Sequence, residues 1–367
     1  MSASLVGSEM CIRDRRMIAG KQSIKFDNNV YIKAGATVAG TKEKKGPLGC
    51  CFDVVSQDDL FGGESWEDAE SRIQSLAFEK LLEKTGMMPD DIRYIYAGDL
   101  LGQLIATSFG LKTYDVPLFG LYGACSTMGE SLSLAAMCVN AGFADNVAAI
   151  ASSHFASAEK QFRFPLLYGN QRPMSSTWTV TGAGAYLVSN SPVITKCDGD
   201  VCRIVDNGYA NVIISGITTG KIVDYGVKDS MNMGACMAPA AADLIEANYK
   251  DFEVTKGYYD MIITGDLGYT GKEILLTLLK EKGIDISDIY TDCGIEVFDK
   301  NEQDTQSGGS GCGCSAIVLD TLVLDKLRKR ELKRVLFVPT GALLSQVSFN
   351  EGKSIPGIAH GVVLEAV

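Results

Sequence analysis

The sequence is poor in histidine and has no long hydrophobic segment. Only two of its 367 residues are histidines, His154 and His360. Protein zinc sites combine cysteine and histidine at regular spacings, and neither the adjacent cysteines at 50 and 51 nor those at 312 and 314 have such a spacing. We therefore expect no structural zinc site. No apolar run approaches the roughly 18 residues that a membrane helix requires, so we expect no transmembrane segment.

Positive charge is also scarce. The chain has 34 Lys and Arg residues against 45 Asp and Glu residues, which gives a formal net charge of −11. Nucleic-acid binding requires clustered basic side chains, and the one lysine-rich stretch, GTKEKKG at 40–46, is typical of a solvated loop. We therefore expect no nucleic-acid partner. The eleven cysteines are odd in number and irregularly spaced, which favours free thiols in a reducing compartment.

The first sixteen residues differ from the rest of the chain. The stretch MSASLVGSEMCIRDRR has neither a periodic apolar face nor the apolar centre of a signal peptide. We interpret 1–16 as a non-native tail and Met17 as the natural start, and an ordinary N-terminal tail is the alternative. Neither interpretation assigns these residues a function.

The stretch LYGACSTMGES at 121–131 contains the strongest candidate site. The apolar run 116–121 predicts a buried strand, and apolar residues from Met128 to Val139 recur at helical spacing. Cys125 then lies at a strand-to-helix turn, where free backbone N–H groups and the helix dipole favour a thiolate. Two interpretations stay open: a functional pocket at Cys125, or a small apolar cysteine packed in a tight turn.

Four segments of the first half recur in the same order in the second half. The pairs are 92–103 with 259–271, 123–126 with 311–315, 145–153 with 333–341, and 181–189 with 358–366. This order predicts an α/β protein built by tandem duplication, with helices between and outside two buried sheets. We place the first half at 17–200 and the second at 201–367.

Two further elements are predicted from local signals. Ser65-x-x-Asp68 resembles a capping box, and Gly86 follows the last residue of the apolar pattern that begins there, so a helix is expected between them. The run 177–189 is expected to form one long strand.

The duplication and the cysteine turn together resemble the thiolase superfamily, which includes thiolases and ketoacyl synthases. The resemblance implies a thiolase-like five-layered αβαβα sandwich, often a homodimer, with Cys125 at the position of the nucleophile. The chain resembles still more closely the stage V sporulation protein AD family of endospore-forming bacteria, from about residue 20 to the C-terminus. The segments that carry this resemblance are GTKEKKGPLG, AGDLLGQ, GACST, AIASSH, AEKQFRFP, YGNQRP, VTGAGA, MAPAAAD, TGDL, GGSGCGCSA, TGALLS and KSIPGIAHG.

The superfamily resemblance also implies where catalytic partners of Cys125 would lie. Condensation needs a thiolate and a His, with a second His or an Asn, to stabilise the enolate or oxyanion. In ketoacyl synthases the His follows the first strand of the second half, which here reads TGDL at 264–267. The Asn lies in a turn that here reads GGSG at 308–311. Because neither stretch holds His or Asn, we expect Cys125 to occupy a vestigial nucleophile position in a protein that is not an enzyme.

Resemblance to the sporulation family implies binding without catalysis. The expected ligand is dipicolinic acid (pyridine-2,6-dicarboxylic acid), taken up into the developing spore with the help of small membrane proteins of the same operon. The expected location is peripheral, at the cytoplasmic face of the forespore inner membrane. Two alternatives stay open: an acyltransferase or ketoacyl-synthase-like enzyme that uses Cys125, and a scaffold protein with a vestigial pocket.

A planar dicarboxylate needs cations and N–H or O–H donors around its carboxylates. The candidates are Arg163 as first choice, Lys160 and Arg172 as seconds, His154 as a further donor, and Tyr168 as a ring that stacks on the ligand. Backbone donors at the Cys125 turn are able to bind an anion as well. The alternatives are that Arg163 and Lys160 are solvated loop charges and that His154 is a satisfied structural histidine.

Asp99 and Asp266 occupy equivalent positions in the two halves. They are expected to be helix N-caps or to reach a Ca²⁺ ion that enters with the dicarboxylate, because hard cations prefer oxygen ligands. Apart from that ion, we expect no cofactor and no resident metal. His360 opens a buried strand and is expected to be structural. The glycine run 307–313 lacks the Gly-Lys-Ser/Thr of a phosphate loop, which argues against a nucleotide.

Overall fold

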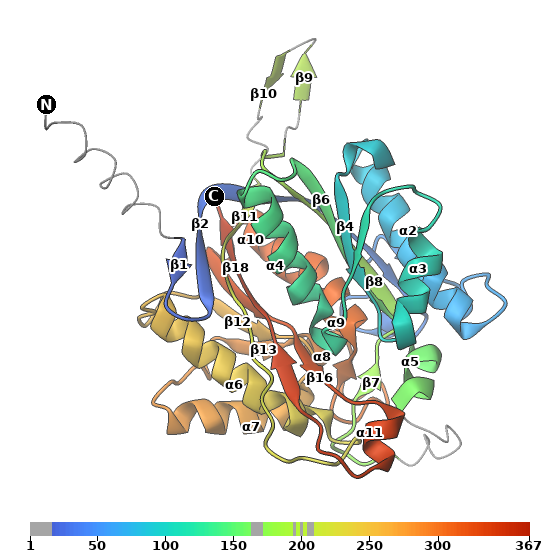
Figure 1. The fold of residues 1–367 in the computed structure, drawn as a ribbon, viewed down its shortest axis with the longest axis vertical. Helices are drawn as coiled ribbons and strands as arrows, with labels where there is room; N and C mark the ends of the chain where they lie inside the picture. The colour runs from blue at the N-terminus through green and yellow to red at the C-terminus, as the bar shows by residue number, and fades with distance from the viewer. Residues whose placement is uncertain (1–16, 163–171, 194–195, 199–200, 204–208) are drawn as a thin grey trace, which may run out of the picture.

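The computed structural model describes residues 17–162, 172–193, 196–198, 201–203 and 209–367 (Figure 1). The tail 1–16, the boundary proposed at 200, and the candidate ligand residues Arg163 and Tyr168 lie outside the described residues. Across the described ranges, none of the helices has the length and apolar character that a membrane crossing requires.

The described strands form one large mixed sheet and three small pairs. The first half contributes β2 (Ser23–Ala39), β4 (Tyr94–Gly98), β5 (Leu118–Gly120), β6 (Asn146–Ser153) and β8 (Gly182–Ser189) to the large sheet. The second half contributes β11 (Val212–Thr218), β12 (Met261–Thr264), β13 (Tyr290–Asp292), β15 (Arg334–Val338) and β18 (Gly361–Ala366). The short strands β1 (Ile18–Ala19) and β3 (Val54–Val55) pair with β2. The small pairs are β7 (Trp178–Thr179) with β14 (Gly309–Ser310), β9 (Lys196–Asp198) with β10 (Val201–Arg203), and β16 (Thr340–Ala342) with β17 (Gly357–Ala359).

The strand order shows the duplication directly. Read inward from its two ends, the large sheet has the orders β5-β4-β6-β8-β2 and β13-β12-β15-β18-β11. Three of the predicted segment pairs fall on equivalent strands: β4 with β12, β6 with β15, and β8 with β18. In the fourth pair, 123–126 forms the turn before α4, whereas 311–315 forms the N-cap and first turn of α9 itself. The predicted internal duplication is therefore confirmed.

Strand β2 joins the two halves. Its N-terminal part, from Ser23 to Tyr31, pairs antiparallel with β11, and its C-terminal part, from Tyr31 to Ala39, pairs antiparallel with β8. With 17 residues, β2 is long enough to belong to both halves. Hydrogen bonding therefore continues from one predicted sheet into the other.

Helices form three layers around the two halves of the sheet (Figure 1). The outer layers are α2 (Trp66–Thr85) with α3 (Ile105–Leu111) on the first half, and α6 (Met233–Asp251) with α7 (Gly268–Glu281) on the second. Between the halves lie α4 (Thr127–Asn140) and α9 (Cys312–Val318), whose apolar residues form the central core with both inner faces. The predicted five-layered αβαβα sandwich is confirmed.

The remaining helices are short. They are α5 (Phe155–Phe162), α8 (Cys293–Glu296), α10 (Asp325–Arg328), α11 (Gln346–Asn350), a π-helical turn η6 (Leu319–Leu324), and the 3-10 turns η1 (Glu43–Lys45), η2 (Pro89–Asp91), η3 (Gly102–Leu104) and η4 (Ala124–Ser126). Several of them, η1, η4 and α5 above all, border the cavities described below.

Helix α2 begins and ends where the sequence predicted. The Ser65 side chain accepts a hydrogen bond from the Asp68 backbone N–H at 3.1 Å, and Gly86 adopts a left-handed φ of 66° at the C-terminus. The Ser65 cap and the left-handed Gly86 each satisfy backbone groups that a helix end otherwise leaves without hydrogen-bond partners.

Two strand predictions need correction. The run 116–121 does form β5, but this strand is not buried: in the described structure it pairs with β4 alone, at the end of the sheet, so Leu118 and Phe119 are 40% and 49% exposed. The run 177–189 is divided into β7 and β8. The division falls at Thr181, whose backbone N–H binds the Glu43 carboxylate at 3.0 Å instead of a neighbouring strand.

Candidate functional site

Cys125 lies in η4, directly before α4, at the predicted strand-to-helix turn. The cavity beside it is lined from both halves of the chain, by residues that include Tyr122, Thr179, Met233 and Leu344. This Cys125 cavity is narrow, since only about 20 Å³ of it is open to the centre of a water-sized sphere. That is room for about one water molecule, whereas small-molecule pockets usually measure about 300–1,000 Å³.

The Cys125 thiol donates a hydrogen bond to the Asp266 carboxylate. Burial, with a further contribution from the nearby Asp266 charge, raises the pKa of Cys125 well above its usual value. The expectation of a thiolate is therefore wrong, because the charge-stabilising effect of a helix N-terminus is smaller than the cost of burying a thiolate beside a carboxylate.

Asp266 lies in the TGDL segment, where the superfamily resemblance would have a histidine. Its Oδ1 accepts a hydrogen bond from Thr340 Oγ1 at 2.6 Å, and its Oδ2 accepts one from the Gly311 N–H at 3.1 Å. Burial raises the pKa of Asp266 to about 7. The side chain therefore joins three segments of the fold, and no histidine is found among the described residues that line the cavity.

Asp99 is not part of the Cys125 cavity. Its Oδ1 accepts a hydrogen bond from the Leu101 N–H at 2.7 Å, and its Oδ2 accepts bonds from the Thr107 N–H and Oγ1. Thr107 is in the first turn of α3, so Asp99 does satisfy a helix N-terminus, although from outside the N-cap position. Asp266 binds instead the residue before α9.

The predicted Ca²⁺ role of the two aspartates finds no support in their surroundings. Each carboxylate is buried and already accepts hydrogen bonds from protein donors. Within the ranges that the structure describes, no group of three or more His, Cys, Asp or Glu side chains is arranged to hold a metal ion.

A much larger cavity lies on the other side of β7. It measures about 500 Å³ and is lined by η1 and the residues around it, by the first residue of α2, by the start of α5, and by β7. We call it the aromatic groove and define it by Lys42, Glu43, Lys45, Trp66, His154, Phe155 and Trp178. Thr179 faces the Cys125 cavity and Trp178 the groove, so the single pocket expected around Cys125 and His154 is two separate cavities.

Flat rings form the walls of the aromatic groove. Trp66 stacks on His154 with ring centroids 5.5 Å apart, and Phe155 stacks on Trp178 with centroids 3.9 Å apart. The Lys42 ammonium lies 3.7 Å from the Trp178 ring centroid. The groove thus combines planar apolar surfaces with positive charge, which suits a flat anion.

Two buried polar atoms at the groove have no hydrogen-bond partner within the described part of the chain: Glu43 Oε2 and His154 Nδ1. His154 Nε2 lies 2.7 Å from the Asp59 carbonyl oxygen, which assigns the ring proton to Nε2 and makes Nδ1 an acceptor. The neutral ring therefore has no N–H left for a ligand carboxylate, so the predicted donor role of His154 is wrong for this form. Burial raises the pKa of Glu43 to about 7 and lowers the pKa of His154. Buried polar atoms normally have partners, so these two point to a bound group or water.

The two other predicted cations, Arg172 and Lys160, are not among the described residues that line the groove. The Arg172 guanidinium lies 4.5 Å from the Trp178 ring centroid, and its Nη2 donates to the Asp304 carbonyl oxygen at 3.2 Å. Lys160 is exposed on α5 and borders a different surface hollow. His360 is buried at the start of β18, with its backbone N–H bonded to the Pro339 carbonyl oxygen.

Sequence reasoning missed most of the groove. It interpreted 40–46 as a solvated loop, yet Glu43 in that loop is only 1% exposed and Lys42 packs on Trp178. One available signal was the scarcity of tryptophan: the chain has only two, Trp66 and Trp178, and both line the groove.

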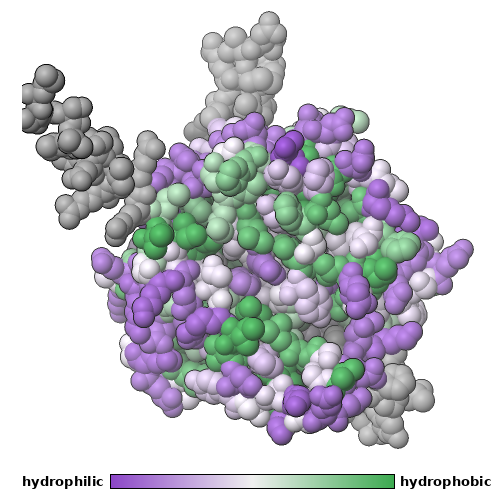
Figure 2. Space-filling view, in the orientation of Figure 1, coloured by the Kyte–Doolittle hydropathy of each residue, from purple (hydrophilic) through white to green (hydrophobic). Residues whose placement is uncertain are grey.

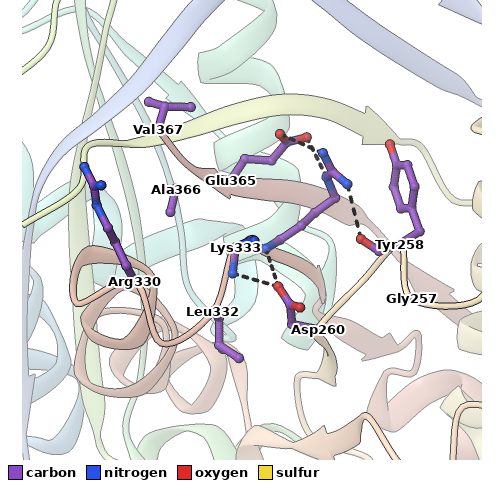
Figure 3. A pocket seen from close by; sticks show the side chains of 10 residues that line it. Gly257, Tyr258, Asp260, Arg330, Leu332, Lys333, Glu365, Ala366 and Val367 are labelled. Atoms are coloured by element: carbon purple, nitrogen blue, oxygen red, sulfur yellow. Dashed lines mark hydrogen bonds and ion pairs between the residues drawn. The ribbon is translucent and has the colours of Figure 1, made fainter.

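A third cavity, of about 400 Å³, lies beside β15 and β18 (Figure 3). Two of its charged groups have partners inside the protein: Arg334 Nη2 donates to Glu365 Oε2 at 3.1 Å, and Asp260 accepts from the backbone N–H groups of Lys333 and Arg334. Because this cavity has no pair of stacked rings among its described lining residues, it is a weaker candidate for a flat ligand than the aromatic groove.

Comparisons with known proteins show the family to which the chain belongs. A family model described as stage V sporulation protein AD (SpoVAD) matches residues 20–365. Stage V sporulation protein AD of Bacillus subtilis (strain 168) is 40% identical over 348 residues, which cover 95% of this chain and 98% of that protein.

Solved structures share the fold at low identity. The acyltransferase ChlB3 matches with a TM-score of 0.56 and 14% identity over 92% of this chain and 98% of its own. A variant of OleA from Xanthomonas campestris matches with a TM-score of 0.53 and 14% identity over 93% of this chain and 99% of its own. The tetronic acid condensing enzyme AbyA1 matches with a TM-score of 0.52 and 15% identity over 92% of this chain and 100% of its own. These likenesses confirm the thiolase-like fold. The chain belongs to the stage V sporulation protein AD family, and its function lies in sporulation.

Proposed function

We propose that this protein binds dipicolinic acid in the aromatic groove, without catalysing a reaction on it, for uptake of the acid into the developing spore. The observation that carries the proposal is the groove itself: about 500 Å³ between stacked rings, with two lysines and an unpartnered buried oxygen on Glu43. Membership of the sporulation family supports the biological setting.

The chemistry of the groove matches a flat dicarboxylate at three points. The pyridine ring packs among the aromatic side chains of the groove, the Lys42 ammonium beside Trp178 pairs with one carboxylate, and exposed Lys45 attracts the other. Glu43 repels a dianion when it is ionised, but when protonated its Oε2 carries a hydrogen and donates it to a ligand carboxylate. A Ca²⁺ ion carried with the ligand would relieve the same repulsion.

Acyl transfer through Cys125 is the less favoured function. Its thiol is protonated and bonded to Asp266, and its cavity has room for about one water molecule. Turnover of acyl-CoA that disappears in Cys125→Ala would establish the enzyme and overturn the binding proposal.

Calorimetric titration of the purified protein with dipicolinate, with and without Ca²⁺, tests the proposal. Saturable binding is expected. Trp178→Ala should weaken it at least about tenfold, because the ring that holds Lys42 and forms part of the aromatic wall is lost, while Trp178→Phe keeps a ring and most of the affinity. Cys125→Ser serves as the control and should bind normally. Absence of binding to folded protein would leave the scaffold alternative.

We further propose that the protein lies at the spore inner membrane as a peripheral protein, held there by small membrane proteins.

We also propose that the protein forms a homodimer at the β5 edge of the large sheet. Phe119 on this edge stacks on Tyr96 at 5.0 Å, and unpaired strand edges with apolar side chains favour pairing with another chain. Apolar surface also gathers over α4 (Figure 2), where Met137 and Phe143 are exposed. Analytical ultracentrifugation of Phe119→Glu should show monomer where the unmodified protein shows dimer.

A further inference from the structure

Two adjacent cysteines are exposed on one surface turn. Cys50 and Cys51 follow η1, and their Sγ atoms lie 3.7 Å apart. The other cysteines whose burial the structure describes are buried: Cys125, Cys138, Cys236, Cys293, Cys312 and Cys314. Thiol reagents therefore reach the pair at 50 and 51 first among these.

The turn that carries the pair is compact and anchored on both sides. The Gly49 N–H binds the Gly46 carbonyl oxygen at 3.0 Å, and the Cys51 N–H binds the Leu48 carbonyl oxygen at 2.9 Å. A side chain at Gly49 would approach the Lys44 carbonyl oxygen to 1.8 Å, so the chain path here requires glycine. The following Phe52 is buried in the core, which fixes the downstream end.

We propose that Cys50 and Cys51 form a dithiol–disulfide redox site that exchanges electrons with low-molecular-weight disulfides. One cysteine, as thiolate, attacks a sulfur of the small disulfide and releases its other half as a thiolate. The second cysteine then attacks the resulting mixed disulfide, which forms the Cys50–Cys51 bond and releases the remaining half. Two protein thiols lose two electrons and two protons, and one small disulfide becomes two thiols.

The proximity of the two sulfur atoms favours the second step over the alternatives. A thiol already in contact with the mixed disulfide competes well against a second small disulfide or a second protein molecule, because its attack is intramolecular. The site is also continuous in sequence with η1, which carries Glu43 and Lys45 at the groove. An effect of oxidation on dipicolinate binding rests on the proposed function. The redox site itself is independent of that function.

Oxidation of the folded full-length protein with oxidised glutathione, read by intact mass and peptide mapping, tests the proposal. The expected product loses the mass of two hydrogen atoms, links Cys50 to Cys51, carries no glutathione there, and returns to the dithiol with dithiothreitol. Phenylarsine oxide, which bridges neighbouring thiols, should bind the reduced protein at this pair.

The double variant Cys50→Ser/Cys51→Ser gives the background from all other cysteines and should lose one equivalent of arsenical. Each single variant should instead hold one glutathione as a stable mixed disulfide. Because both side chains are exposed, these variants should fold normally by circular dichroism. Stable glutathione on both cysteines of the unmodified protein, or arsenical uptake equal to that of the double variant, would overturn the proposal.

Discussion

The Cys125 cavity and the aromatic groove lie on opposite sides of β7, and they differ in almost every property that matters for binding. The cavity carries the recognisable motif but is narrow, and its polar groups bind one another. The groove carries no familiar motif, but it is wide and leaves two buried polar atoms without partners in the described structure. The turn that carries the superfamily motif is thus closed by its own polar contacts, while the neighbouring groove has the room for a ligand.

The largest effect we predict is in thiol reactivity. Alkylation of Cys125 by iodoacetamide at pH 7 should be at least roughly a hundredfold slower than alkylation of Cys50, because the buried thiol has a raised pKa and the thiolate is the reactive form. Peptide mapping over time measures both rates in one sample. Labelling of Cys125 as fast as that of Cys50 would mean that the cavity is open and its cysteine ionised.

The second prediction concerns stability. Asp266→Ala should lower the free energy of unfolding by about 3 kcal/mol, because buried donors from Thr340, Gly311 and Cys125 lose their acceptor. Asp59→Ala, at the exposed rim of the groove, should cost less than about 1 kcal/mol. Urea denaturation compares the two. An equal loss of unfolding free energy in the two variants would contradict the difference that we describe between the Cys125 cavity and the aromatic groove.

The third prediction is a pH dependence set by Glu43, whose pKa is raised by burial to about 7 from an ordinary value of 4.5. The protonated form donates to a ligand carboxylate, so dipicolinate affinity without Ca²⁺ should fall as pH rises through 7, by up to about tenfold per pH unit. Glu43→Gln should flatten this fall in a titration series from pH 6 to 8. An affinity that rises with pH, or a Gln variant with an unchanged profile, would contradict the proposed contact.

The raised pKa of Glu43 also predicts a pH dependence of protein stability, which is measured without a ligand. A carboxyl group with a raised pKa in the folded state makes the protein less stable as pH rises from about 4.5 to 7, because ionisation is easier in the unfolded chain. Glu43→Gln should reduce this loss. Asp266, whose pKa is also about 7, contributes in the same direction, so part of the loss should remain.

The smallest effect is expected at the rim. Lys45→Ala should weaken dipicolinate binding only a few-fold, since Lys45 is exposed and its charge is screened by water and salt. Lys42→Ala should cost more, because Lys42 is half-buried against Trp178. Titrations at low and high salt should show the Lys45 contribution disappear at high salt. A Lys45 effect larger than that of Lys42 would place the ligand further out than we propose.

Local patterns in the sequence predicted much of the fold. The Ser65 cap, the helix after Cys125 and the repeated strands depend on residues close together in the chain, and all three are confirmed. The exposure of β5 was predicted wrongly, because it depends on how many neighbours the strand has in the finished sheet.

The sites were harder to predict because their parts come from distant segments. The raised pKa of Cys125 depends on its burial and, next, on Asp266, which lies in the other half of the chain. The groove depends on Glu43, His154 and Trp178, which only the fold brings together. Local sequence could identify a cysteine turn, but not the carboxyl group that faces it.

Fluorine NMR of protein labelled with fluorotryptophan tests the central claim most directly, because both tryptophans of the chain line the groove and neither lines the Cys125 cavity. Single substitutions of Trp66 and Trp178 by Phe assign the two resonances. Added dipicolinate should shift both resonances in a saturable way, with the larger shift at Trp178, and should do so equally in Cys125→Ser. Saturable binding by calorimetry that leaves both resonances unmoved would place the ligand elsewhere and contradict the account.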